Sequence, residues 1–312
     1  MGALCQKCIN RKELKEESIE LKFPEYKSSQ DEVFSKIEKK YNPLEYFQLY
    51  SFILLLNNIN VTENQEVSLD HYQGSTVEVK AGISDLKVVK REHLQELSRE
   101  EFIMFVGNKV LKHFLVATIV NDIEDFPQIY KDYSLELYGS ILAARADMEK
   151  RKNNGVKVKK PKAIKKLYLF PYALLFCNCN AEGKLELLFS LFGNERKEFA
   201  LCSELEDFLY FLFITPSFCS FRAIKRIAEK FPARFEAISA QEYVNKTDAY
   251  EVEDILRLRE IFIRDFFGGK TALTRKDYDV KFLSGEFAWI FSPSGIRHNL
   301  EKNNIPKEPV QA

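Results

Sequence analysis

The stretch from residue 184 to residue 213 constrains the fold of this chain most strongly, because two apolar segments of helical length flank a polar break. Residues 184–192 read KLELLFSLF and residues 205–213 read LEDFLYFLF, without glycine or proline. Between them, the polar run GNERKE precedes the apolar triplet FAL, and Ser203 then offers a helix start. The pattern predicts a helix, a loop with a short extended piece, and a second helix.

The composition favours a helical fold and argues against several classes of protein. Only 12 Gly and 10 Pro occur in 312 residues, which favours a mainly helical fold over a turn-rich β fold. Lys+Arg and Asp+Glu both total 46, so no general electrostatic attraction to nucleic acid is expected. Six scattered cysteines do not form a disulfide framework and indicate a reducing compartment. No apolar run approaches the about 20 residues that a transmembrane helix needs.

The stretch from residue 184 to residue 213 resembles an EF-hand, the helix–loop–helix unit that binds calcium. A functional loop supplies oxygen at its first, third and fifth positions and a bidentate Glu at its twelfth. Here Gly193 stands first, Glu195 third, Lys197 fifth and Glu204 twelfth. Gly193 carries no ligand, and Lys197 places a cation where an acceptor is needed. The resemblance therefore implies a degenerate, calcium-silent hand, with no bound metal and no cofactor.

EF-hands usually occur in pairs whose loops touch through a short antiparallel contact. Residues 261–278 read IFIRDFFGGKTALTRKDY, which fits a helix, a short loop and a second helix. We expect residues 272–274 to lie beside residues 199–201, with Asp277 in the place of Glu204. The resemblance thus implies a C-terminal lobe built on a degenerate EF-hand-like pair.

A basic stretch is the clearest candidate for a boundary between two helical lobes. Residues 149–166 contain nine Lys or Arg residues, together with Gly155 and Pro161. Before this stretch, an apolar helix containing Leu49, Phe52 and Leu56 is predicted to lie in a core. The predicted organisation is an N-terminal tail (1–28), a helical lobe with a loop-rich insertion (29–148), a basic linker (149–166), an EF-hand-like lobe (167–292) and a C-terminal tail (293–312).

The basic linker has two readings, a solvated loop or a binding patch. As a patch, it would fit an anionic membrane surface or an acidic protein. Nucleic acid is not favoured, because no aromatic residues interleave with the basic ones. The residues of this predicted patch are Lys150, Arg151, Lys152, Lys157, Lys159, Lys160, Lys162, Lys165 and Lys166.

The first residues, MGALCQKC, resemble a signal for dual acylation. Gly2 would carry a myristoyl group, and Cys5 or Cys8 a palmitoyl group as the second membrane signal. Gln6 departs from the pattern, which asks for Ser or Thr, so an ordinary tail is the alternative. The expected location is the cytoplasmic side, anchored to a membrane or built into a cytoskeletal or ciliary structure.

Two other patterns resemble binding motifs only in part. Cys177 and Cys179 could join Cys5 and Cys8 in a zinc site, but their spacing is too tight for the usual knuckle. Residues 268–271, GGKT, are similar to the end of a phosphate-binding loop, but Arg264 stands where the earlier Gly belongs. We therefore expect no catalytic residues.

These observations lead to an expected function. The chain is predicted to be a non-catalytic adaptor or structural subunit of a multi-subunit assembly, in which the calcium-silent lobe binds proteins. A calcium-responsive EF-hand regulator at a membrane is one alternative, and an unrecognised enzyme is another.

Overall fold

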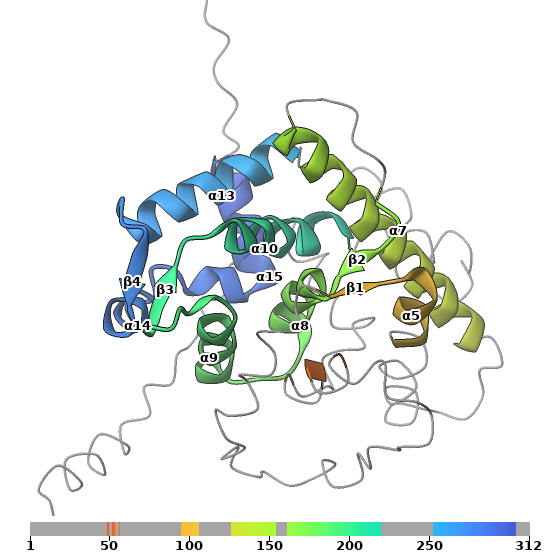
Figure 1. Cartoon of the computed structure of the whole chain (residues 1–312), viewed down its shortest axis with the longest axis horizontal. Coiled ribbons are helices and arrows are strands. Elements are labelled where there is room, and N and C mark those ends of the chain that lie inside the picture. Colours follow the sequence, from red (N-terminus) through yellow and green to blue (C-terminus); the bar gives the residue numbers. More distant parts are fainter. Residues whose placement is uncertain are drawn as a thin grey trace, which may run out of the picture.

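The protein is mainly helical in the parts of the chain that its computed structural model describes, which are residues 49, 52–53, 56, 95–105, 126–153, 161–219 and 252–303. Helix accounts for 76% of these residues, and the strands form only tiny sheets (Figure 1). The predicted mainly α class is confirmed. The α-helices in the described parts are α5 (Arg99–Ile103), α7 (Phe126–Lys152), α8 (Phe170–Phe176), α9 (Ala181–Phe192), α10 (Ser203–Ile214), α13 (Val252–Phe267), α14 (Arg275–Leu283) and α15 (Pro293–Asn303).

Shorter helical turns extend or connect these helices. The turn η3 (Lys166–Leu169) leads into α8, and the π-helical turn η4 (Thr215–Cys219) continues α10. The 3₁₀ turn η6 (Ala288–Phe291) joins α14 to α15.

The described strands form two antiparallel pairs. Strand β1 (Glu96–Leu97) pairs with β2 (Ile164–Lys165), and β3 (Glu198–Ala200) pairs with β4 (Ala272–Thr274). In Figure 1 the β3–β4 pair lies at the left and the β1–β2 pair at the right, with α8 and α10 between them.

The β3–β4 pair is the predicted contact between the two loops. Phe199 stands opposite Leu273, and the paired residues of the first strand begin one position earlier than expected, at Glu198. The N–H of Leu201 still reaches across and donates to the carbonyl of Thr271 at 2.8 Å. The prediction that these two distant segments lie side by side is confirmed.

The same local arrangement occurs in both strand pairs. Each strand contributes one buried apolar residue, and these residues face each other as Leu97 with Ile164 and Phe199 with Leu273. After each strand the chain soon enters a helical segment, α5 after β1, η3 and α8 after β2, α10 after β3, and α14 after β4.

Polar caps explain where several of these helices begin. Ser98 and Glu101 form a reciprocal capping box at the start of α5. The Thr274 hydroxyl accepts from the N–H of Asp277 at the start of α14, at 3.1 Å. Both caps follow the buried residue of the strand directly, so each helix begins two residues after that buried residue.

One continuous core joins the described elements. The ring of Phe199 lies at the centre of the β3–β4 side, where it meets Phe189, Phe192, Phe266, Phe267 and Tyr278. On the other side, Tyr168 of η3 stacks on Phe211 of α10 with ring centroids 3.8 Å apart. Buried residues from both sides of the predicted linker therefore belong to the same core.

Four residues of the predicted N-terminal core helix fall within the described parts, and all are buried. They are Leu49, Phe52, Ile53 and Leu56. The prediction that this segment contributes to a core is confirmed. The predicted tail 1–28 and the loop-rich part of the first lobe lie outside the described residues.

The predicted C-terminal tail, 293–312, is wrong over its first part. Residues Pro293–Asn303 form α15, in which Ile296 and Leu300 are fully buried. The two side chains stand one helical turn apart, so a narrow apolar stripe is enough to dock the helix. Residues 304–312 lie outside the described parts.

The predicted linker, 149–166, is ordered at both ends. Helix α7 continues to Lys152, and Ile164 and Lys165 form β2. Lys166 is only 1% exposed, so it does not belong to a surface patch. Residues 154–160 of the predicted linker lie outside the described parts.

Replacing Phe199 by Ala tests the central position of this ring. Because the side chain is 1% exposed and surrounded by other rings, we expect the free energy of unfolding to fall by about 3–5 kcal/mol. Urea denaturation followed by circular dichroism measures the loss. Val280→Ala is the control, because this side chain is 56% exposed and its truncation should change stability by no more than about 0.5 kcal/mol. Equal losses of stability in the two variants would contradict the central position of Phe199 in the core.

Candidate functional site

The candidate site is the helix–loop–helix pair around β3 and β4, which is formed by α9, α10, α13 and α14. These elements carry the loop positions that correspond to the calcium ligands of an EF-hand.

The first loop closes through its own hydrogen bonds. Helix α9 ends at Phe192, and after Gly193 the next four residues form a tight turn in which the backbone N–H of Asn194 donates to the carbonyl of Glu198 at 2.8 Å. The Asn194 side chain accepts from the N–H of Glu198 at 2.9 Å and donates to its carboxylate at 3.0 Å. Lys197 completes the turn with a φ of 59°. The turn is therefore held by an asparagine that the sequence analysis did not single out.

The predicted ligand positions of this loop do not converge. Glu195 and Lys197 are exposed at the turn, whereas the Glu204 carboxylate lies in the first turn of α10. The backbone N–H of Glu204 donates to that carboxylate and lowers its pKa, as does the Ser203 hydroxyl at 3.0 Å. Protein groups therefore already hold the acidic group at the twelfth position.

The second loop brings a cation to its acidic position. Gly268 and Gly269 have φ values of 58° and 80°, which form the sharp turn after α13. This turn is followed by Lys270, whose ammonium lies 3.7 Å from the Asp277 carboxylate. The acidic group predicted to correspond to Glu204 thus has a lysine as its counter-ion.

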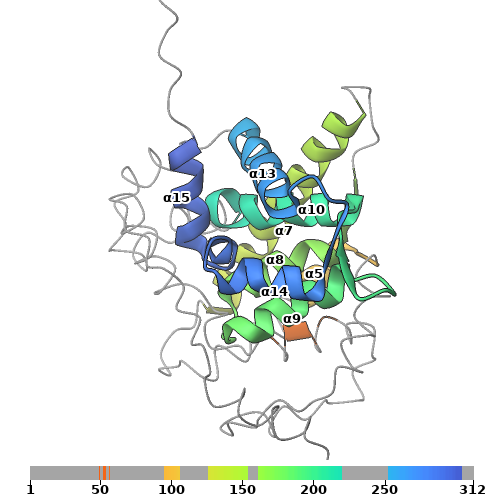
Figure 2. The same ribbon diagram turned by 90° about the vertical axis from the view of Figure 1, so that its left-hand side faces the viewer.

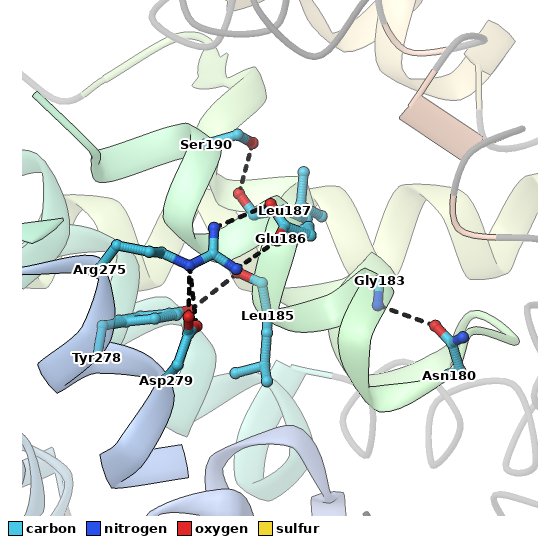
Figure 3. Close-up of polar contacts among 9 residues, drawn as sticks. All are labelled: Asn180, Gly183, Leu185, Glu186, Leu187, Ser190, Arg275, Tyr278 and Asp279. Atoms are coloured by element: carbon cyan, nitrogen blue, oxygen red, sulfur yellow. Dashed lines mark hydrogen bonds and ion pairs between the residues drawn. The ribbon is translucent and has the colours of Figure 1, made fainter. Parts of the chain in front are cut away.

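An arginine links the two helix–loop–helix units at the surface. The Arg275 guanidinium, at the start of α14, donates to both carboxylate oxygens of Glu186 on α9 and to Asp279 on its own helix (Figure 3). Its plane also lies over the ring of Phe189, 4.5 Å from the ring centroid. Beneath it, the buried hydroxyl of Tyr278 donates to the carbonyl of Leu185 at 2.9 Å. These contacts join α9 of the first unit to α14 of the second.

The electrostatics of this arginine follow from its partners. Burial alone would lower the pKa of the Arg275 guanidinium, but the hydrogen bonds that it donates to Glu186 and Asp279 outweigh burial and raise this pKa. Burial likewise raises the pKa of the Tyr278 hydroxyl well above its ordinary value. Arg275 is thus a permanent cation and Tyr278 a neutral donor. The spacing of Arg275 and Asp279 could have been recognised as a helical ion pair, but nothing local in the sequence indicates Glu186.

The burial of the lysine of α9 is a further feature that the sequence analysis did not predict. Lys184 points into the core, where its ammonium donates to the carbonyl of Phe291 at 3.4 Å. Burial lowers the pKa of this lysine. Its position within an apolar run, as the first residue of KLELLFSLF, was the only available signal.

The two cysteines of the zinc alternative lie close to Lys184. Burial raises the pKa of both the Cys177 and the Cys179 thiol, which disfavours the thiolate that zinc requires. Cys5 and Cys8, the other residues of that alternative, lie outside the described parts. In the parts that are described, no cluster of three His, Cys, Asp or Glu side chains could hold a metal ion.

The residues of the predicted basic patch have different surroundings in the structure. Lys150 and Lys162 are exposed, and Lys165 lies over the ring of Tyr168. Arg151 forms ion pairs with Asp147 and Glu253, and Lys152 with Asp207. Lys157, Lys159 and Lys160 lie outside the described residues.

The residues predicted to attach the chain to a membrane are not among those that the structure describes. Gly2, Cys5 and Cys8 lie outside them, so acylation stays a prediction. Across the described segments, no helix has the length and apolar character needed to cross a membrane.

Comparison with protein-family models, with curated proteins and with solved structures found no match for this chain. A functional conclusion therefore depends on the geometry of the described residues.

Replacing Arg275 by Met tests the link between the two units. The variant loses two carboxylate contacts and the stacking on Phe189, so we expect stability to fall by about 1–2 kcal/mol, given that these groups are partly exposed. Arg275→Lys is the matched control for charge. It should recover little of the loss, because an ammonium cannot contact both carboxylates and stack on the ring. Full recovery in Arg275→Lys by urea denaturation would show that charge alone matters.

Replacing Lys184 by Met tests the buried ammonium through its pH dependence. The folded-state pKa of Lys184 is lowered, whereas the unfolded chain has the ordinary lysine value. Between these two pKa values the unfolded state binds more protons, so stability rises with pH. We expect the stability of the wild type relative to Lys184→Met to increase as the pH is raised toward the ordinary lysine pKa. Urea denaturation at a series of pH values measures this, and a constant difference would contradict it.

Proposed function

We propose that this protein is a non-catalytic adaptor or structural subunit, in which an EF-hand-like pair binds other proteins and keeps its shape without calcium. The observation that supports this most directly is the β3–β4 pair, whose two loops are closed by protein groups. Each loop contributes to this conclusion in a different way.

The first loop is closed by an amide. The Asn194 side chain both accepts from and donates to Glu198, which joins the two ends of the turn. A calcium ion would need several oxygen atoms free to turn inward. With Lys197 exposed in this turn and the Glu204 carboxylate already hydrogen-bonded, this loop is proposed to be calcium-silent.

The second loop carries its own positive charge. The ammonium of Lys270 lies beside Asp277, the residue at the position of the bidentate carboxylate. We propose that this ammonium neutralises the carboxylate in place of an ion. Arg275 then holds α14 against α9, so the pair stays closed.

The β1–β2 pair supports a finer proposal about the fold. Its buried residues Leu97 and Ile164 face each other as Phe199 and Leu273 do, and a capped helix follows Leu97 as one follows Leu273. We propose that it belongs to a second EF-hand-like pair, which forms the other helical lobe. The two lobes would then be fused through the stacking of Tyr168 on Phe211.

The proposed partners are proteins of a multi-subunit assembly, with an anionic membrane surface as an additional contact. The exposed Lys150 and Lys162 support the second contact, because a lysine ammonium near an anionic surface is attracted to it. The location on the cytoplasmic side, at a membrane or in a cytoskeletal or ciliary structure, is part of the same proposal.

A calcium titration tests the silent pair. We expect the melting temperature in millimolar calcium to equal that in excess chelator, because the loop carboxylates are already engaged by Ser203 and Lys270. Scanning fluorimetry of the full chain measures it.

The matched variant for this titration is Glu204→Ala combined with Asp277→Ala. If calcium stabilises the wild type and not this variant, the calcium-responsive alternative replaces the proposal. For each protein, the melting temperature in calcium is compared with that in chelator. A change in the stability of the variant itself therefore does not affect the result.

A further inference from the structure

The chain that follows α14 returns across the helix–loop–helix pair and touches all of its helices. Trp289 stacks on Phe213 of α10, with ring centroids 5.6 Å apart, and meets Phe262 of α13 at 5.9 Å. Phe291 meets Phe282 of α14 at 5.2 Å. Figure 2 shows α15 continuing from this segment beside α13.

Helix α9 completes this set of contacts through a polar group. Its buried Lys184 donates to the carbonyl of Phe291 at 3.4 Å. In addition, Phe287 packs edge-on against both Phe262 and Phe266 of α13, with ring centroids 5.7 and 5.1 Å apart. Residues 287–291 therefore occupy the apolar surface at which the four helices of the pair meet.

Contacts with distant residues hold this segment in place, because its rings meet α10, α13 and α14. The N–H groups of Ala288, Ile290 and Ser292 donate to carbonyl groups three residues earlier at 3.2 to 3.4 Å, which is the pattern of 3₁₀ turns. Gly285 precedes it with a φ of 81°, in a turn next to exposed residues. After this segment in the sequence, the buried Arg297 of α15 donates to the carbonyl of Pro216 at 3.3 Å. A short segment whose buried side chains contact all four helices of the pair lies as a docked peptide would.

We propose that residues 287–300 are an intramolecular ligand of the pair, and that the partner is a protein segment with bulky aromatic side chains that takes this position when residues 287–300 leave it. The proposal deepens the proposed function, since it rests on the pair being an interaction module. It identifies the surface, the occupant and the chemistry of the competitor.

The test uses the full chain and a synthetic peptide of residues 286–303 that carries Trp289→Phe and a fluorescent label. Trp289 is the single tryptophan of the protein, so its emission reports whether the chain's own segment is in place. The variant Gly295→Ala weakens this segment, because a Cβ atom there would lie 2.6 Å from the backbone oxygen of Trp289.

We expect Gly295→Ala to shift the Trp289 emission to longer wavelength and to bind the labelled peptide at least about tenfold more tightly than the wild type. Gly139→Ala is the matched control, because a Cβ atom at Gly139 meets nothing within 4 Å. It should behave as the wild type. The proposal is overturned if the emission shifts without peptide binding, if neither changes, or if all three proteins bind the peptide equally.

A second measurement decides the matter if Gly295→Ala fails to fold. A protease site is inserted in the turn between Ser284 and Glu286, both of which are exposed, and the folded chain is then cut. We expect the C-terminal fragment to stay bound and to be exchanged by the labelled peptide. A fragment that falls away without peptide binding, or one that never exchanges, overturns the proposal. The calcium titration is independent of both measurements, so the failure of one proposal is distinguishable from the failure of the other.

Discussion

The antiparallel pairing of β3 with β4 is the constraint on which the better part of the described structure depends. Side chains alternate between the two faces of a strand, so the register that sets Phe199 opposite Leu273 places both in the core. A shift of one residue would replace the Phe199 ring by Glu198 or Ala200 and leave five surrounding rings without their central contact. Because α14 begins directly after β4, its position follows from the same register.

Features that depend on neighbouring residues were predictable from the sequence. The apolar runs at 184–192 and 205–213 correspond to α9 (Ala181–Phe192) and α10 (Ser203–Ile214), with boundaries within three residues of those expected. The contact of residues 199–201 with residues 272–274 followed from the resemblance to a paired hand, and only its register differs. Hydrophobic periodicity and turn residues are local signals, so they can be recognised in the sequence before the fold is known.

Apart from the β3–β4 contact, features that depend on distant residues were not predictable. Arg275 meets Glu186 across 89 positions of sequence, and neither residue indicates the other. Helix α15 lies where the sequence predicts a tail, because Ile296 and Leu300 are its only buried large apolar side chains and the other anchor is the charged Arg297. Lys166 was assigned to an exposed patch because its neighbours are basic, yet the fold encloses it. In each case tertiary packing overrides what the local composition suggests.

The contact between Lys270 and Asp277 has a consequence for how the proposed pair would respond to its surroundings. A metal ion occupies a loop in proportion to its concentration, whereas an ammonium on the same chain is always present at the same effective concentration. Chelators and changes in cellular calcium cannot remove it, and it carries a single charge, so one carboxylate is enough to balance it. Under the proposed function, such a unit would hold a permanent charge at a position where an EF-hand holds a variable one. In that proposal, what would vary is the polypeptide that lies against its helices.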